Sequence, residues 1–179
     1  MRTRLPRAER ERQMLATAHA LFAERGYAEV TMDEVAAAVG VTKPLLYNYF
    51  GNKDRLYAAC MAPAAEALAD AIVAAVRAAS TPAEALSRAI HAYFAFLDGD
   101  REGWRVLFDE SRPVTVAEYR ERLAGLILDE LDAAVEPLTV AVLGAAEALG
   151  RWWLRTEAMP SATAADLLIR TLEPGLRTS

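Results

Sequence analysis

The chain has 179 residues, of which 54% are hydrophobic, and its formal net charge at pH 7 is −5. A chain of this length can bury a hydrophobic core without help from disulfides or metal ions. The single cysteine, Cys60, excludes an intramolecular disulfide and fits a reducing compartment. The arginine-rich residues 1–12 contain no apolar segment of the signal-peptide kind, and the longest uncharged run, 137–146, is about half a membrane span. We therefore expect a cytoplasmic protein with no membrane partner.

Charge is distributed unevenly along the chain. Residues 1–57 carry nine Lys and Arg against seven Asp and Glu, whereas residues 58–179 carry 11 against 18. Net acidity alone argues against a nucleic-acid partner, but a basic end joined to an acidic body fits a DNA-binding region attached to a second domain. Helical surfaces often carry charges of both signs, so the charge distribution alone does not establish DNA binding, and the sequence motifs have to be considered.

The N-terminal third predicts two helices before the first sharp turn. Apolar residues recur at spacings of three and four over residues 9–25, and Gly26 is placed to end that helix. Thr31 stands three residues before Glu34, which is the capping-box arrangement, and a short amphipathic helix follows as far as Gly40.

A third helix is expected from Thr42, as its cap, to Phe50, with Pro44 in the first turn. Two short helices joined by residues 40–42 and preceded by a longer one predict a helix-turn-helix, whose second short helix enters the major groove. At 100° per residue, Leu46 and Phe50 share one side, which we expect to pack. The free side carries Pro44, Leu45, Tyr47 and Asn48.

Asn52 is placed to cap a longer helix from residue 53, which Pro63 should kink or interrupt before residues 80–82. Further helices are expected at residues 83–97, 101–111, 116–135, 138–159 and 163–172, and no strand pattern competes with them. The predicted fold class is therefore all-α. Residues 1–57 are expected to form a three-helix helix-turn-helix domain, and residues 58–179 a helical-bundle domain for effector binding and dimerisation.

Four segments carry a family resemblance: LFAERGY (21–27), TMDEVA (31–36), GVT (40–42) and LYNYFGNK (46–53). They resemble the signature of the TetR family of transcriptional regulators, over residues 9–57 in all. The resemblance implies that Thr31 approaches the DNA backbone, while further positions hold phosphates or face bases. The implied DNA-binding set is Thr31, Thr42, Lys43, Pro44, Leu45, Tyr47, Asn48, Tyr49 and Lys53.

Within this set, base contacts specify the sequence and phosphate contacts position the protein. The resemblance assigns phosphates to Tyr47, Tyr49 and Lys53. Lys43 has the geometry to contact guanine O6 and N7, and Asn48 to contact adenine N6 and N7, with about 1–3 kcal/mol of discrimination each.

One helix-turn-helix covers few base pairs, so a homodimer on a palindromic double-stranded operator is expected, with half-sites roughly 34–36 Å apart. In the family the last two helices usually form the dimer interface. The candidate interface residues here are Leu149, Trp152, Trp153, Leu167, Leu168 and Leu172. The alternative is that the tryptophans belong to the core of their own chain.

Family analogy also implies a small, mostly apolar effector, which favours a dimer whose recognition helices are wrongly spaced for the operator. The protein would then be a repressor that the effector releases from DNA. The candidate pocket residues are His91, Tyr93, Phe96, Trp104, Arg105, Phe108, Glu147 and Arg151. A core role is the alternative, because several of these aromatic residues also follow the spacing of a buried helix face.

No motif indicates catalysis or a cofactor. His19 and His91 have no partner at metal-ligand spacing, and there is no Ser/His/Asp set, Cys/His set or Gly-rich phosphate loop. We therefore expect no metal site, no cofactor and no enzymatic activity. Four alternatives stay open: an activator, a regulator for which the ligand is a co-repressor, a protein-interaction module that uses Tyr47 and Tyr49, and a redox-sensing role for Cys60.

Overall fold

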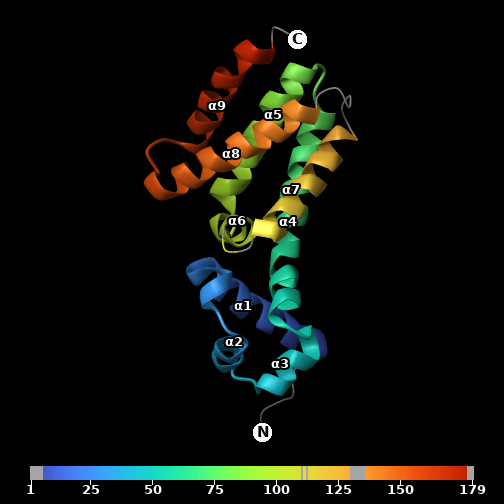
Figure 1. The fold of residues 1–179 in the computed structure, drawn as a ribbon, viewed down its shortest axis with the longest axis vertical. Coiled ribbons are helices and arrows are strands. Elements are labelled where there is room, and N and C mark those ends of the chain that lie inside the picture. The colour runs from blue at the N-terminus through green and yellow to red at the C-terminus, as the bar shows by residue number, and fades with distance from the viewer. Residues whose placement is uncertain (1–5, 110, 112, 130–135, 177–179) are drawn as a thin grey trace. The chain divides into compact units, whose positions relative to one another are not determined.

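The computed structural model describes residues 6–109, 111, 113–129 and 136–176. Throughout these ranges the regular structure is helical, which confirms the all-α fold class (Figure 1). The end of the helix predicted at 116–135 falls outside the described residues. The helices are α1 (Arg7–Glu29), α2 (Met32–Val39), α3 (Lys43–Phe50), α4 (Lys53–Arg77), α5 (Pro82–Gly99), α6 (Arg101–Leu107), α7 (Pro113–Leu128), α8 (Glu136–Thr156) and α9 (Ser161–Leu176).

The chain forms two compact units. The N-terminal unit comprises residues 1–64 and 102–116, and the C-terminal unit comprises residues 65–101 and 117–179. Nearly all of α6 therefore belongs with the helix-turn-helix, although it lies far from α1–α3 in the sequence. The domain boundary predicted between residues 57 and 58 stays a prediction, and sequence patterns gave no reason to group α6 with α1–α3.

An aromatic cluster holds α1 against α4 in the N-terminal unit. Phe22 is buried on α1, and the ring of Tyr57 meets it edge-on with centroids 4.9 Å apart. Tyr27 contacts the same Tyr57 ring at 5.1 Å, and the Tyr57 hydroxyl donates to the Val106 carbonyl just before the end of α6. Edge-to-face pairs of this kind add about 0.5–1.5 kcal/mol beyond the burial of area.

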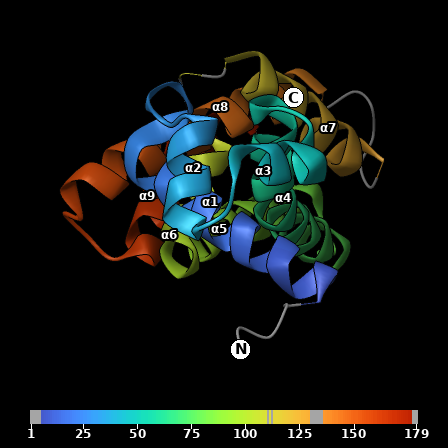
Figure 2. The ribbon, with the colours of Figure 1, turned by 90° about the horizontal axis from the view of Figure 1, so that it is seen from below.

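The turns around α2 follow the sequence prediction. Thr31 and Glu34 form the predicted capping box. At the other end, the amides of Gly40 and Val41 bond to carbonyls of α2, and Gly40 is left-handed with φ 76°. This turn brings α3 next to α2, as Figure 2 shows.

Three predictions about helix ends and breaks have different outcomes. The break at Gly26 is confirmed, with φ 77° inside α1. Asn52 caps α4 as predicted, since its Oδ1 accepts from the Arg55 amide at 2.8 Å. Thr42 occupies the N-cap position of α3 as predicted, but its side chain makes no cap hydrogen bond. Pro44 has no amide to donate, and the Leu45 amide already bonds to the Thr42 carbonyl at 3.0 Å.

Of the two outcomes expected at Pro63, the interruption is wrong, because α4 runs through it, and the kink stays a prediction. Pro63 is exposed, so water can reach the carbonyl that loses its amide donor there. By length and composition α4 is apolar enough to cross a membrane. Of its most apolar 18-residue window 33% is buried, and the buried residues of α4 include Leu56, Leu68 and Ile72.

The C-terminal unit is built on contacts among α5, α8 and α9. The buried face of α5 carries Ile90, Tyr93, Phe94 and Leu97, as its helical spacing predicts. On α9 the buried positions include the small residues Ala164 and Ala165, which let α9 approach α5 closely. From the sequence alone, the apolar side chains used in this packing could equally have belonged to an interface with a second chain.

We predict opposite effects for two glycine substitutions. At Gly40 a Cβ would meet nothing within 4 Å, but φ is +76°, so Gly40→Ala should destabilise the fold by about 1–2 kcal/mol through backbone strain alone. Gly125 lies within α7, also with nothing within 4 Å of an added Cβ and without a positive φ. Gly125→Ala should therefore stabilise the protein by about 0.5–1 kcal/mol. Urea unfolding measures both, and equal effects would contradict the prediction.

Candidate nucleic-acid interface and effector region

The two faces of α3 are those that the sequence predicts. Leu46 and Phe50 are buried, whereas Lys43, Tyr47 and Asn48 are exposed. Pro44 is exposed as well, and Leu45 and Tyr49 are half-buried at one edge of the free face. α3 therefore presents a polar and aromatic surface that its own packing does not use.

Lys43 has an internal partner at the start of α2. Its Nζ lies 2.8 Å from Asp33 Oδ1 and 3.0 Å from Oδ2, and this hydrogen-bonded ion pair raises the pKa of Lys43. Nζ also lies 6.0 Å from the ring centroid of Tyr47. Lys43 must leave or share Asp33 in order to contact a base.

The hydroxyl of Thr31 is also engaged. It donates to Glu34 Oε2 at 2.8 Å and accepts from the Glu34 amide at 3.2 Å. The hydrogen bonds from Thr31, followed by one from Arg25, lower the pKa of Glu34. A phosphate at this helix start would meet backbone amides more readily than the hydroxyl.

Lys53 lies over the ring of Tyr27, with Nζ 4.0 Å from the centroid. The Tyr27 hydroxyl donates to Asp54 Oδ1 at 2.6 Å, and the Tyr27 amide donates to the Asp109 carboxylate. Asp109 follows α6, so one contiguous set of contacts joins the end of α6 to the lysine expected to hold a phosphate. Sequence reasoning missed Tyr27 and Asp109 in this role, although Tyr27 stands inside the LFAERGY segment.

Tyr49 contacts the first turn of α1. The Arg7 guanidinium carbon lies 5.3 Å from the centroid of the Tyr49 ring, in cation–π geometry. Arg7 thereby adds positive charge beside α3 that the implied DNA-binding set does not include.

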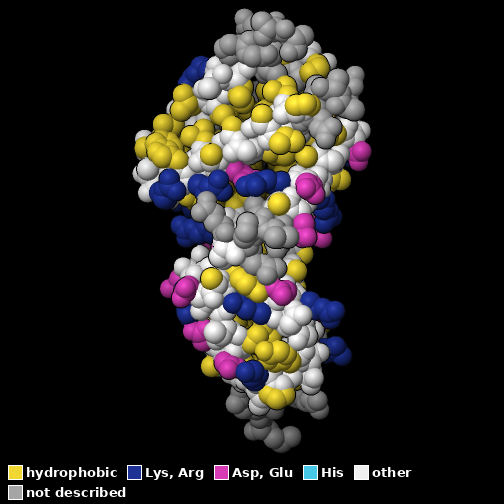
Figure 3. Space-filling view, in the orientation of Figure 1, with side chains coloured by type: hydrophobic (Ala, Val, Ile, Leu, Met, Phe, Trp, Pro, Cys, Tyr) yellow, Lys and Arg dark blue, Asp and Glu magenta, His cyan; other side chains and the backbone are white. Residues whose placement is uncertain are grey.

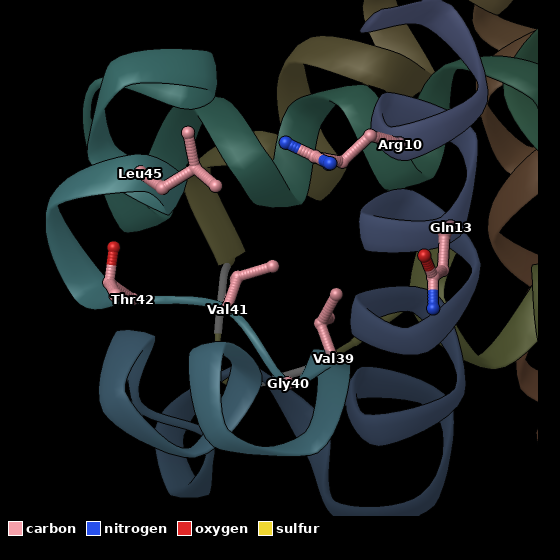
Figure 4. A pocket seen from close by; sticks show the side chains of 7 residues that line it. All are labelled: Arg10, Gln13, Val39, Gly40, Val41, Thr42 and Leu45. Carbon is pink, nitrogen blue, oxygen red and sulfur yellow. The ribbon is translucent and has the colours of Figure 1, made fainter. Parts of the chain in front are cut away.

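An open groove of about 360 Å³ lies between α1 and the turn from α2 to α3 (Figure 4). Arg10 and Gln13 line it from α1, and Thr42 and Leu45 line it from the start of α3. Residues 39–41 of the turn complete the lining. Two of the predicted DNA-binding residues, Thr42 and Leu45, thus share this groove with side chains of α1.

The eight candidate effector residues divide between the two units. Trp104, Arg105 and Phe108 belong to the N-terminal unit, where the buried rings of Trp104 and Phe108 lie 4.9 Å apart. Arg105 is exposed. The C-terminal unit contains the other five: His91, Tyr93, Phe96, Glu147 and Arg151.

A buried carboxylate organises part of the C-terminal unit. Glu147 has 2% of its surface exposed, and both of its oxygens accept from the Arg120 guanidinium. Arg151 Nη1 lies 3.7 Å from the same carboxylate, and the bonds to Glu147 raise the pKa of Arg120. The face of this unit in Figure 3 carries Lys and Arg side chains near one another. Sequence reasoning missed Arg120, because its partner lies 27 residues away with no local spacing rule to connect them.

His91 joins α5 to α9 at the surface of the C-terminal unit. Its Nδ1 lies 2.9 Å from the Ser87 carbonyl oxygen, and its Nε2 lies 3.1 Å from Asp166 Oδ1. Tyr93 is buried and Phe96 is half-buried on the same helix. These contacts give His91 a structural role whether or not an effector binds nearby.

The candidate interface residues differ in exposure. Trp153 is buried: its Nε1 donates to the Met159 carbonyl at 2.7 Å, and the Arg101 guanidinium lies 5.0 Å from its ring. Leu168 is buried too, whereas Leu167 is 41% exposed. Leu149, Trp152 and Leu172 are half-buried.

The redox alternative for Cys60 is contradicted. Burial raises the pKa of its thiol to about 12, and its Sγ contacts the Leu15 carbonyl oxygen. A reactive thiolate needs a lowered pKa and access to solvent. Cys60 is therefore a core residue of the N-terminal unit.

Comparisons with known proteins agree along the chain. Residues 14–60 match the family described as bacterial regulatory proteins of the tetR family, and residues 82–173 match the tetracyclin repressor-like C-terminal domain. A relative from Mycolicibacterium smegmatis, the HTH-type transcriptional activator FasR, is 30% identical over 167 residues, which cover 86% of this chain and 76% of FasR. The chain belongs to the TetR family of transcriptional regulators.

Solved structures agree with this assignment. A TetR-like transcriptional regulator from Rhodococcus sp. RHA1 is 34% identical, with a TM-score of 0.78, over 98% of this chain and 100% of that one. FadR from Bacillus subtilis, solved in complex with stearoyl-CoA, is 18% identical with a TM-score of 0.72, over 90% of this chain and 96% of that one. The FadR likeness shows the shared fold.

We predict that Asp33→Asn strengthens DNA binding. The change removes the internal partner of Lys43 and one negative charge beside the DNA-binding surface, so the affinity for duplex DNA should rise about threefold at moderate salt. Fluorescence anisotropy measures the effect. Asp70→Asn, an exposed change on α4 within the C-terminal unit, is the control. Weaker binding of Asp33→Asn would show that Asp33 orients Lys43 for DNA instead of competing with it.

A second prediction concerns Glu147. Glu147→Gln removes the buried negative charge that both oxygens of the carboxylate present to Arg120. It should destabilise the protein by about 2–3 kcal/mol, at the low end for a broken ion pair because Arg120 is partly exposed. Thermal and urea unfolding measure the loss. Glu121→Gln, at an exposed position of α7, should change stability by less than about 0.5 kcal/mol.

Proposed function

We propose that this TetR-family regulator is a cytoplasmic homodimeric repressor, which binds a palindromic operator through α3 and leaves it when a small, mostly apolar effector binds. The observation that carries this proposal is the free face of α3. Lys43, Tyr47 and Asn48 are exposed on a helix whose opposite side is fixed by the burial of Leu46 and Phe50. We propose no catalytic activity for the chain.

DNA recognition divides between positioning and reading. Tyr47, Tyr49, Lys53 and the start of α2 at Thr31 hold phosphates in this proposal. Thr42, Lys43, Pro44, Leu45 and Asn48 face bases, with Lys43 on guanine and Asn48 on adenine. The partial burial of Leu45 and Tyr49 places them at the edge of that surface.

Release of DNA is proposed to pass through α6. This helix packs in the N-terminal unit, yet α5 precedes it and α7 follows it in the chain, and both lie largely in the C-terminal unit. An effector that prefers one arrangement of α5 and α7 would shift α6 and, with it, Asp109. Asp109 accepts a hydrogen bond from the Tyr27 amide, and the ring of Tyr27 makes a cation–π contact with Lys53. Such a shift would therefore move a phosphate contact.

In the C-terminal unit the proposed effector site uses His91, Tyr93, Phe96, Glu147 and Arg151, together with Arg120. The other candidates, Trp104, Arg105 and Phe108, stay candidates within the N-terminal unit. The proposed dimer interface uses Leu149, Trp152, Leu167 and Leu172, with Trp153 and Leu168 packed behind them in their own chain. Bacillus subtilis FadR, a solved structure with the same fold, was determined in complex with stearoyl-CoA, a ligand with a long apolar chain.

Activation of transcription is the second candidate. It is favoured by the relative FasR, which is named an activator and is 30% identical to this chain. Both candidates use the same DNA-binding surface, so reporter transcription with and without the regulator separates them.

The test of the proposal is anisotropy on duplexes from upstream of the protein's own gene and on scrambled controls, between about 50 and 200 mM salt. Selective, steeply salt-dependent binding with two protomers per operator is expected. Sequence selection on random duplexes extends the test to distant operators. Failure to select any sequence, with and without candidate co-repressors, would overturn the proposal.

Asn48→Ala is predicted to relax the base preference at one position of each half-site, with a loss of about 1–3 kcal/mol on the preferred duplex and little change on non-specific DNA. The measurement is binding to a set of operators with single-base substitutions. An unchanged preference at every position would remove Asn48 from the base-reading set. Asp70→Asn again serves as the control that leaves both affinity and preference as they are.

A further inference from the structure

We propose that the groove between α1 and the start of α3 is an additional phosphate-binding site for the operator strand, with Arg10 as its charged ligand and Gln13 as a neutral hydrogen-bond donor. The proposal adds a contact that lies outside the segments of α2, α3 and α4 to which DNA binding is assigned above. It rests on α3 being the recognition helix.

Arg10 is directed into the groove. Figure 4 shows its side chain extending from α1 toward Val41 and Leu45. The side chain is half-buried, and among the described residues no acidic group contacts its guanidinium. Partial removal of the guanidinium from water costs free energy when no anion pairs with it. A guanidinium that faces open space in this state therefore favours the binding of an anionic ligand.

The nearby charges of α1 distinguish Arg10 from its neighbours. Arg12, two residues further along, is exposed and pairs with Glu9. Of the two acidic residues at the start of α2, Asp33 pairs with Lys43 and Glu34 pairs with Arg25. Arg7 lies on the Tyr49 ring at the edge of α3. Arg7 and Arg10 therefore form a basic strip on the side of α1 that borders α3.

The occupant follows from continuity with the proposed interface. Thr42 and Leu45 line the groove and also belong to the free surface of α3. A duplex whose major groove holds α3 presents its sugar–phosphate strands alongside that helix, one negative charge per nucleotide. A phosphate is thus the anion brought to the mouth of this groove when α3 binds.

The experiment compares Arg10→Gln with Arg12→Gln, two variants with the same change in net charge on the same helix. Anisotropy is measured on the selected operator and on a scrambled duplex over a range of salt. Arg10→Gln should weaken binding roughly tenfold per protomer at 0.1 M salt on both duplexes, and lower the salt slope by about one per protomer. Arg12→Gln should leave the slope unchanged. Arg10→Lys keeps the charge and should keep the slope.

A methylphosphonate scan of the operator provides a second readout that does not depend on comparing folded stabilities. Neutralising the phosphate held by Arg10 should weaken binding of the wild-type protein and of Arg10→Lys, but not of Arg10→Gln. Thermal unfolding shows that the variants are folded.

Equal slopes for the two glutamine variants would overturn the inference, as would a loss of affinity confined to the operator with an unchanged slope. The latter result would make Arg10 a base contact. If the wild-type protein selects no sequence, it is the assignment of α3 that fails. If the wild type is selective and Arg10→Gln behaves like Arg12→Gln, only the phosphate site fails.

Discussion

Burial of Leu46 and Phe50 is the constraint on which the N-terminal unit depends. α3 has only eight residues, too few to be stable in isolation, so packing both forms the helix and sets its rotation. Once these two side chains are fixed, the positions of Lys43, Tyr47 and Asn48 follow from helical geometry. The left-handed Gly40 then sets where α3 starts relative to α2.

Local rules account for most of what the sequence could predict. The capping box at Thr31, the breaks at Gly26 and Gly40, and the Asn52 cap all depend on residues within a few positions of one another. Even there a competing local rule can prevail: Thr42 has the right side chain for a cap, but Pro44 offers no amide and the amide of Leu45 is already used by the backbone. The faces of α3 were predictable for the same reason, since they require only the helical period.

Contacts distant in sequence account for the rest. Nothing near Asp109 indicates that it bonds to the Tyr27 amide, 82 residues earlier, or that α6 packs with the helix-turn-helix. The same holds for Arg120 and Glu147. Sequence patterns marked Trp153 as apolar without stating which surface covers it, because core and interface positions on a helix share one periodicity. The candidate site was thus predictable for α3 and much less so for the C-terminal unit.

The pair of Lys43 and Asp33 gives the proposed DNA-binding surface a counter-ion within the same chain. A lysine in water is surrounded by mobile salt ions that gain entropy when DNA replaces them. Asp33 is covalently part of the chain and gains no such entropy when it is displaced. The contact between DNA and Lys43 must therefore supply the free energy that breaking the ion pair costs. A phosphate exchanges one anion for another and is present along the whole duplex, whereas a guanine edge in the proposed contact supplies two acceptors at one base only. If Lys43 contacts bases as proposed, the carboxylate would lower the affinity for all DNA and leave the operator, with its additional contacts, less affected than non-cognate DNA, which in a genome outnumbers it by about a millionfold or more.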